Sequence, residues 1–197
     1  MKKKTVYLLF LSTGTILART IDFYTKTSLN HVSIALDQEL DFVYSFGRKR
    51  PNNPFIGGFI KENLNLPFFN RSSCAVYQLK VTEEEYDQLV EQIMIMESHK
   101  HLYRYNFLGL LGVMMNKELQ RDNAYFCSQF VATMLQECGV YDGDKPPGLI
   151  RPQDLRDWRE LRLVYQGQLK NYPNFIYQPE QAEARSLRRS FLSLFHL

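Results

Sequence analysis

The sequence lacks any long hydrophobic run. Its longest unbroken apolar segment, residues 6–11, is six residues long, whereas a membrane-spanning helix needs roughly 20. It also lacks the low hydrophobicity and high charge of disordered chains, since 45% of the residues are hydrophobic and 23% are charged. The 197 residues therefore predict a globular protein, with enough chain to bury the core of one domain and a short appendage.

The chain has little net charge, and its excess of basic residues is confined to one end. Lys and Arg number 24 and Asp and Glu 21, which gives +3. Residues 151–197 hold eight of the basic and five of the acidic residues, so the first 150 residues are neutral. A domain without a net positive field is not expected to bind nucleic acid, and we exclude that class of partner.

Cysteine is scarce. Cys74, Cys127 and Cys138 form an odd set without a CxxC pair. A disulfide framework would be even and denser, and a zinc site needs closer ligand clusters. His99 and His101 are two residues apart, which places them on different faces of a helix. The sequence therefore implies neither a metal nor an organic cofactor.

The N-terminus has two interpretations. The three lysines of residues 2–4 and the apolar residues 5–11 imitate the charged and apolar regions of a secretory signal. The apolar stretch is short, rich in β-forming residues and followed by no good cleavage site, which favours a strand that opens the domain. We therefore expect a cytoplasmic protein.

Several segments have the composition and alternation of β-strands. They are residues 5–11, 31–36, 41–46, 74–80 and 161–165. Stretches rich in Pro and Gly predict loops at residues 50–54, 57–58 and 144–148. Because strands and helices do not alternate regularly, the pattern predicts an α+β fold with a mainly antiparallel sheet.

Three segments of this domain are predicted to be helical. Residues 18–26 form a short one. Thr82 and Glu85 have the spacing of a capping box and begin the second, whose apolar residues predict one buried stripe: Tyr86, Leu89, Val90, Ile93 and Met94. The third covers residues 126–138 and ends at Gly139.

The C-terminal end differs in character, so we divide the chain into a domain of residues 1–170 and an extension of residues 171–197. Apolar residues recur at helical spacing in this extension: Leu187, Phe191, Leu194 and Phe195. Residues 180–197 are therefore predicted to form an amphipathic helix. The apolar face of this helix has three possible binding surfaces: the domain itself, a partner protein, or an anionic membrane.

Two residues are placed for nucleophilic chemistry. Cys127 starts its predicted helix, where unpaired N–H groups and the helix dipole lower the pKa of a thiol and can stabilise an oxyanion. His31 opens a predicted strand, where an imidazole can act as general base. Both also have a structural interpretation, as a buried apolar cysteine and a surface histidine.

Short motifs in this order resemble those of a known family, the circularly permuted branch of the NlpC-type papain-like thiol hydrolases. They are residues 13–17, 30–36, 43–45, 125–131 and 149–155. The branch includes YiiX-like proteins and lecithin–retinol acyltransferase-like enzymes, and its histidine strand precedes its cysteine helix, as here. The resemblance covers residues 5–165 and implies a permuted papain-like fold, with an antiparallel sheet packed against the cysteine-bearing helix.

The resemblance implies a cysteine-dependent hydrolase or acyltransferase that acts on an amide, peptide or ester bond. Cys127 would be the nucleophile and His31 the base, and a third polar group would orient the imidazole. YiiX-like relatives often carry Glu on the next strand, where this chain has Ser45, a departure from the pattern. A hairpin that pairs Leu36 with Leu40 places Ser45 opposite His31, and a shift of two residues keeps Ser45 on the same face. A shift of one residue places it on the other face, so the role of Ser45 depends on the register.

The same resemblance suggests where substrate binds. Tyr105, in an aromatic segment before the cysteine helix, and Tyr125 and Ser128, beside Cys127, are the expected substrate-binding residues. A peptide, an amide or an acyl lipid would fit as substrate. The alternative function is a non-catalytic lipid- or peptide-binding module that keeps the papain-like cleft, and its main support is the lack of a carboxylate at Ser45.

Overall fold

The computed structural model describes residues 2–12, 29–50 and 53–177. Six antiparallel strands form its main sheet, in the order β4-β3-β2-β1-β5-β8. Their bounds are β1 (Lys3–Leu11), β2 (His31–Ala35), β3 (Val43–Arg50), β4 (Asn53–Lys61), β5 (Ser73–Thr82) and β8 (Arg162–Gln168). A second, parallel pair consists of β6 (Arg104–Tyr105) and β7 (Ala124–Tyr125). The fold is therefore α+β, as the sequence predicts.

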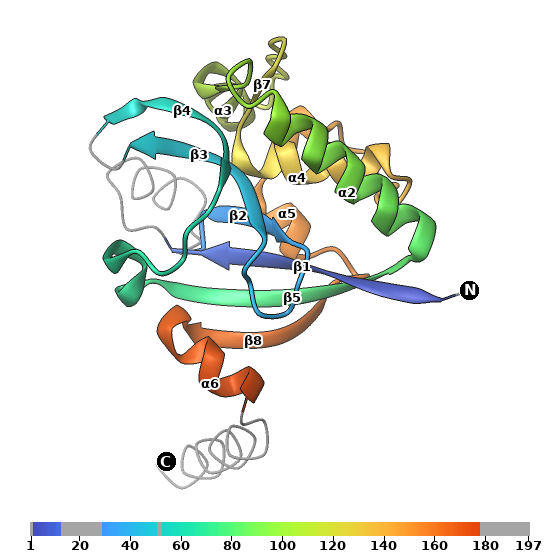
Figure 1. Ribbon diagram of the computed structural model, residues 1–197. Helices are drawn as coiled ribbons and strands as arrows, with labels where there is room; N and C mark the ends of the chain where they lie inside the picture. Colours follow the sequence, from blue (N-terminus) through green and yellow to red (C-terminus); the bar gives the residue numbers. More distant parts are fainter. Residues whose placement is uncertain (1, 13–28, 51–52, 178–197) are drawn as a thin grey trace, which may run out of the picture.

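The helices are α2 (Glu83–Ser98), α3 (Phe107–Met114), α4 (Cys127–Glu137), α5 (Pro152–Arg156) and α6 (Tyr172–Tyr177). Helices α2 and α4 cover one face of this sheet, and α6 lies at the β8 edge and contributes to the core on the other face (Figure 1). Short 3₁₀ helices are η1 (Pro67–Arg71), η2 (Pro147–Leu149) and η3 (Leu169–Asn171). Helices α2 and α4 pack side by side on the same face, whereas α6 lies beside β8.

Both faces of the sheet are buried, which explains the apolar run in β1. Val6, Leu8 and Phe10 belong to the larger core, which also contains the inward faces of α2 and α4. Leu9 and Leu11 belong to a second core on the other face, together with residues of η3 and α6. A strand covered on both faces is apolar at successive positions rather than at alternate ones.

All five predicted strands are present, but the sequence missed β4. Gly57 and Gly58 were predicted to be a loop, and they lie inside this strand. The reason is close packing: a Cβ atom on Gly57 would lie 2.8 Å from the Cβ of Tyr105 and 2.9 Å from the carbonyl oxygen of Gly47. Glycine in a strand marks such an approach as well as a loop, and sequence alone does not separate the two.

The predicted helix that begins at Thr82 and the predicted helix at residues 126–138 are confirmed in the structure. In α2, the Thr82 hydroxyl accepts a hydrogen bond from the Glu85 N–H at 3.2 Å, and the Glu85 carboxylate accepts from the Thr82 N–H at 2.6 Å. Of the predicted stripe, Leu89 and Ile93 are buried and Tyr86 and Val90 are partly buried. Met94 is 40% exposed, and Met96 is buried in its place. Helix α4 is followed by Gly139 at φ +72°, a conformation that suits glycine after a helix.

The beginning of the predicted C-terminal extension packs on the sheet. Tyr172 is buried in the second core, and its hydroxyl donates to the carbonyl oxygen of Gln38 at 2.8 Å. The predicted helices at residues 18–26 and 180–197 lie outside the described residues. Among the helices of the described ranges, none combines the length and the apolar character that crossing a bilayer requires.

Candidate active site

Cys127 is the first residue of α4 and lies against the start of β2. The preceding residue, Phe126, is extended, and its N–H donates to the side-chain oxygen of Gln129 at 3.4 Å, which caps the helix. The Cys127 Sγ atom lies 4.0 Å from the carbonyl oxygen of Asn30. The cysteine therefore sits in the first helical turn, as the sequence predicts, and it is only 5% exposed.

His31 lies between Cys127 and a carboxylate that the sequence analysis did not single out. Its Nε2 atom is 2.7 Å from Oε1 of Glu62, whose side chain is 3% exposed. The imidazole also lies close enough to the Cys127 thiol to lower its pKa. The structure thus brings a thiol, an imidazole and a buried carboxylate into one chain of contacts.

The three groups stabilise one another's charged forms. Burial alone lowers the pKa of His31, but the charge of Glu62 and the contacts with Cys127 outweigh it and raise that pKa to about 10. Burial raises the pKa of the Cys127 thiol, yet the hydrogen bond and charge of His31, with the N–H groups of Val32 and Ser128, hold it below its ordinary value. Both shifts favour the ion pair of thiolate and imidazolium over the neutral pair.

The other two cysteines have the opposite environment. Burial raises the pKa of Cys74 to about 12. Burial, followed by the charge of Glu137, raises the pKa of Cys138 to about 11. Both thiols are buried and free, so of the three cysteines only Cys127 has a lowered pKa.

Glu62 follows the last residue of β4, two positions after Ile60, which pairs with Ser45 of β3. Alternate residues of a strand share a face, so Ser45 and Glu62 point to the same side of the sheet. The sequence missed this carboxylate, because it predicted loops at residues 50–54 and 57–58 and no strand directly before residue 62. Residues 58–62 do not alternate between apolar and polar side chains, since Phe59 and Ile60 are adjacent, so no local pattern marked this strand.

The β2–β3 register is the one shifted by two residues, and it puts Ser45 on the face of His31. Ile34 pairs with Tyr44 and Ala35 with Val43, a shift of two residues from the pairing of Leu36 with Leu40. Continued along the strands, this register places Ser33 opposite Ser45. The catalytic role of Ser45 stays a prediction, while the side chain on the His31 ring nitrogen is that of Glu62.

The hydroxyls of Ser33 and Ser45 adjoin the carboxylate, and both residues are fully buried. Ser33 donates to Glu62 Oε1 at 2.6 Å. Ser45 makes no hydrogen bond of ordinary geometry within the described chain, but it lies near enough to Glu62 to lower the pKa of the carboxyl. Burial raises that pKa, and His31, Ser33 and Ser45 together hold it below its ordinary value.

The three predicted substrate-binding residues lie around the start of α4. Tyr105 and Tyr125 pair between β6 and β7, directly before the helix. The Tyr125 ring is half-buried and lies 5.0 Å from the ring of Phe46, centroid to centroid. Ser128 is buried, and its hydroxyl donates to the carbonyl oxygen of Ile150 at 2.7 Å. The Ser128 hydroxyl can therefore donate to a substrate only if this bond breaks, although its oxygen can still accept.

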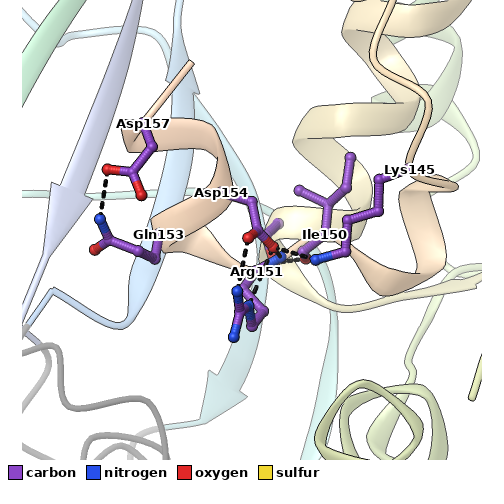
Figure 2. A network of polar contacts seen from close by, with 7 residues as sticks. Lys145, Ile150, Arg151, Gln153, Asp154 and Asp157 are labelled. Carbon is purple, nitrogen blue, oxygen red and sulfur yellow. Dashed lines mark hydrogen bonds and ion pairs between the residues drawn. The ribbon is translucent and has the colours of Figure 1, made fainter. Parts of the chain in front are cut away.

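The carbonyl that receives Ser128 belongs to a segment held by a polar network (Figure 2). Asp154 accepts from Lys145 at 2.6 Å and from the Arg151 guanidinium at 2.8 Å. Burial raises the pKa of Asp154, but these two cations outweigh it and lower that pKa to about 2. The segment that leads into α5 is therefore fixed beside the N-terminal turn of α4.

No protein-family model matches the chain, and no curated protein matches it significantly. Within residues 2–12, 29–50 and 53–177, no group of three or more His, Cys, Asp or Glu side chains is arranged to hold a metal ion. The functional argument therefore rests on the geometry around Cys127 and on the sequence motifs.

Proposed function

We propose that the protein is a cysteine-dependent hydrolase or acyltransferase with a permuted papain-like fold, acting on an amide, peptide or ester bond. One observation carries the proposal: Cys127, at a helix N-terminus, contacts His31, which in turn contacts the buried carboxylate of Glu62. This chain of groups has the roles of nucleophile, base and orienting group that acyl transfer uses. The order of the chain, with the histidine strand before the cysteine helix, supports the permuted arrangement.

In the first half of the reaction, the Cys127 thiolate attacks the carbonyl carbon of the substrate. The resulting oxyanion is stabilised by N–H groups of the first turn of α4. The imidazolium of His31 gives its proton to the leaving amine or alcohol, which departs as the tetrahedral intermediate collapses to a thioester on Cys127. Glu62 orients the ring and stabilises its charged form before this step.

In the second half, His31 takes a proton from water in a hydrolase, or from an acceptor hydroxyl or amine in an acyltransferase. The activated oxygen or nitrogen attacks the thioester, and the acyl group leaves Cys127 as the thiolate re-forms. Tyr105, Tyr125 and Ser128 would border a peptide, amide or acyl-lipid substrate. A cytoplasmic location is part of the proposal, since thiols stay reduced there.

The alternative, a non-catalytic binding module, depended on the absence of a carboxylate at Ser45. Glu62, directly after β4, supplies a carboxylate to the His31 imidazole instead. This contact favours the enzyme over the binding module.

The decisive experiment is to trap the acyl-enzyme. Purified protein is incubated with ester, amide and acyl-lipid model substrates, quenched in acid and digested, and the peptide that contains Cys127 is examined by mass spectrometry. We expect an acyl adduct on Cys127, and none on the Cys127→Ser variant under the same treatment. The absence of any adduct, with native Cys127 also resistant to iodoacetamide, would contradict an enzymatic role.

A further inference from the structure

The environment of Glu62 contains more hydrogen-bond donors than a carboxylate needs to orient one histidine. Its Oε1 atom lies 2.7 Å from His31 Nε2 and 2.6 Å from Ser33 Oγ. Ser33 is fully buried, and its Oγ is 3.4 Å from the same ring nitrogen. The Ser33 hydroxyl therefore forms its shorter hydrogen bond with the Glu62 carboxylate and not with the His31 ring.

Ser45 approaches the same carboxylate from the adjacent strand. Its hydroxyl is buried and is one of two side-chain polar groups of the described residues that are enclosed without a partner. An enclosed hydroxyl without a partner is unfavourable, and a hydroxyl proton rotates freely about its C–O bond. Continued along the strands, the β2–β3 register places Ser45 opposite Ser33, which donates to Glu62. Ser45 also lowers the pKa of this carboxyl, so we assign the carboxylate as its acceptor.

We propose that Ser33 and Ser45 form a hydroxyl cradle that keeps Glu62 ionised and aimed at His31, which makes both serines positioning residues for the Cys127–His31 pair. This inference rests on the proposed function for its catalytic meaning, and it assigns Ser45 a role different from direct contact with the imidazole. At the position where relatives often carry Glu, this chain would then have the Ser45 hydroxyl, which donates to the carboxylate of Glu62 after β4.

The groups that face Glu62 come from strands β2 and β3, and Cys127 of α4 affects it indirectly through His31. Strand β2 contributes His31 and Ser33, and β3 contributes Ser45. Cys127 of α4 acts on the carboxylate through His31. A carboxylate that loses a hydroxyl donor binds a proton more readily. Once Glu62 is protonated, His31 loses its anionic partner, and the Cys127 thiolate is stabilised less.

The test is the titration of the Glu62 carboxyl carbon, followed by carbon-13 NMR in the full-length protein. We expect its midpoint to rise by about one pH unit in Ser33→Ala, because a hydrogen bond to a charged group is lost. Ser45→Ala should raise the midpoint less, and the double variant more than either. Ser33→Thr, which keeps a hydroxyl, should return the midpoint to the wild-type value. Ser72→Ala, at a buried serine between η1 and β5, is the matched control and should change nothing.

A second measurement links the cradle to the thiol. The acid-side midpoint of Cys127 alkylation by iodoacetamide should rise in the double variant and stay unchanged in Ser72→Ala. If the Glu62 midpoint is the same in wild type, Ser33→Ala and Ser45→Ala, the cradle is refuted. If Glu62 responds as expected but Cys127 is unreactive in every protein, the cradle stands and the proposed function fails.

Discussion

Replacing Glu62 by Gln is the sharpest perturbation of the candidate site. Glutamine keeps the size of the side chain and an oxygen that can accept from His31, but it removes the negative charge. The carboxylate is 3% exposed and 2.7 Å from the ring nitrogen, so solvent screens this charge little. Breaking a buried pair by removing one partner costs about 3–5 kcal/mol, which corresponds to about two to four pH units in the pKa of the remaining group.

The pKa of His31, raised to about 10 in the wild type, should therefore fall into or below the neutral range in Glu62→Gln. A larger fraction of His31 is then neutral, so the Cys127 thiolate is stabilised less. The pKa of Cys127 rises toward the ordinary value of a thiol. At pH 7 we expect the rate of Cys127 alkylation by iodoacetamide to drop about tenfold or more. The pH at which the alkylation rate falls to half its maximum should rise by as many pH units as the pKa of Cys127 does.

The assay is peptide-resolved mass spectrometry of alkylation, with time points collected between pH 4 and 10. Glu91→Gln, at an exposed glutamate of α2, is the control for the loss of one negative charge. Circular dichroism verifies that each variant is folded. If Cys127 in Glu62→Gln reacts at the wild-type rate with an unchanged midpoint, the carboxylate does not govern the histidine, and the electrostatic argument is wrong.

Three other outcomes are expected. Cys127→Ser should abolish turnover and leave the melting temperature nearly unchanged; a variant that unfolds would instead identify the cysteine as a core residue. In the native protein, iodoacetamide should modify Cys127 much faster than Cys74 or Cys138, with a rate that falls as pH drops through the lowered pKa of Cys127; equal rates in peptide mapping would exclude an activated thiol. Ser128→Ala leaves the buried Ile150 carbonyl without this partner and should cost about 1–3 kcal/mol of unfolding free energy in urea titrations; a change confined to KM would support the predicted contact with substrate.

Local patterns in the sequence determined most of the elements and two of the site residues. The capping box at Thr82 and the glycine after residue 138 depend on hydrogen bonds within a few residues, so they can be read without the fold. The placement of Cys127 at a helix start and of His31 at a strand start is equally local. Their chemistry follows from the residue type and its position in the element.

The tertiary structure decided which residues surround that pair. Glu62 reaches His31 only because β4 pairs with β3, and the glycine that hid this strand is required by the approach of Tyr105, a residue distant in sequence. The face of Ser45 depended on a hairpin register that the sequence left open between alternatives. The charges of the site depend on burial, since a carboxylate 2.7 Å from an imidazole perturbs its pKa strongly only where water is excluded.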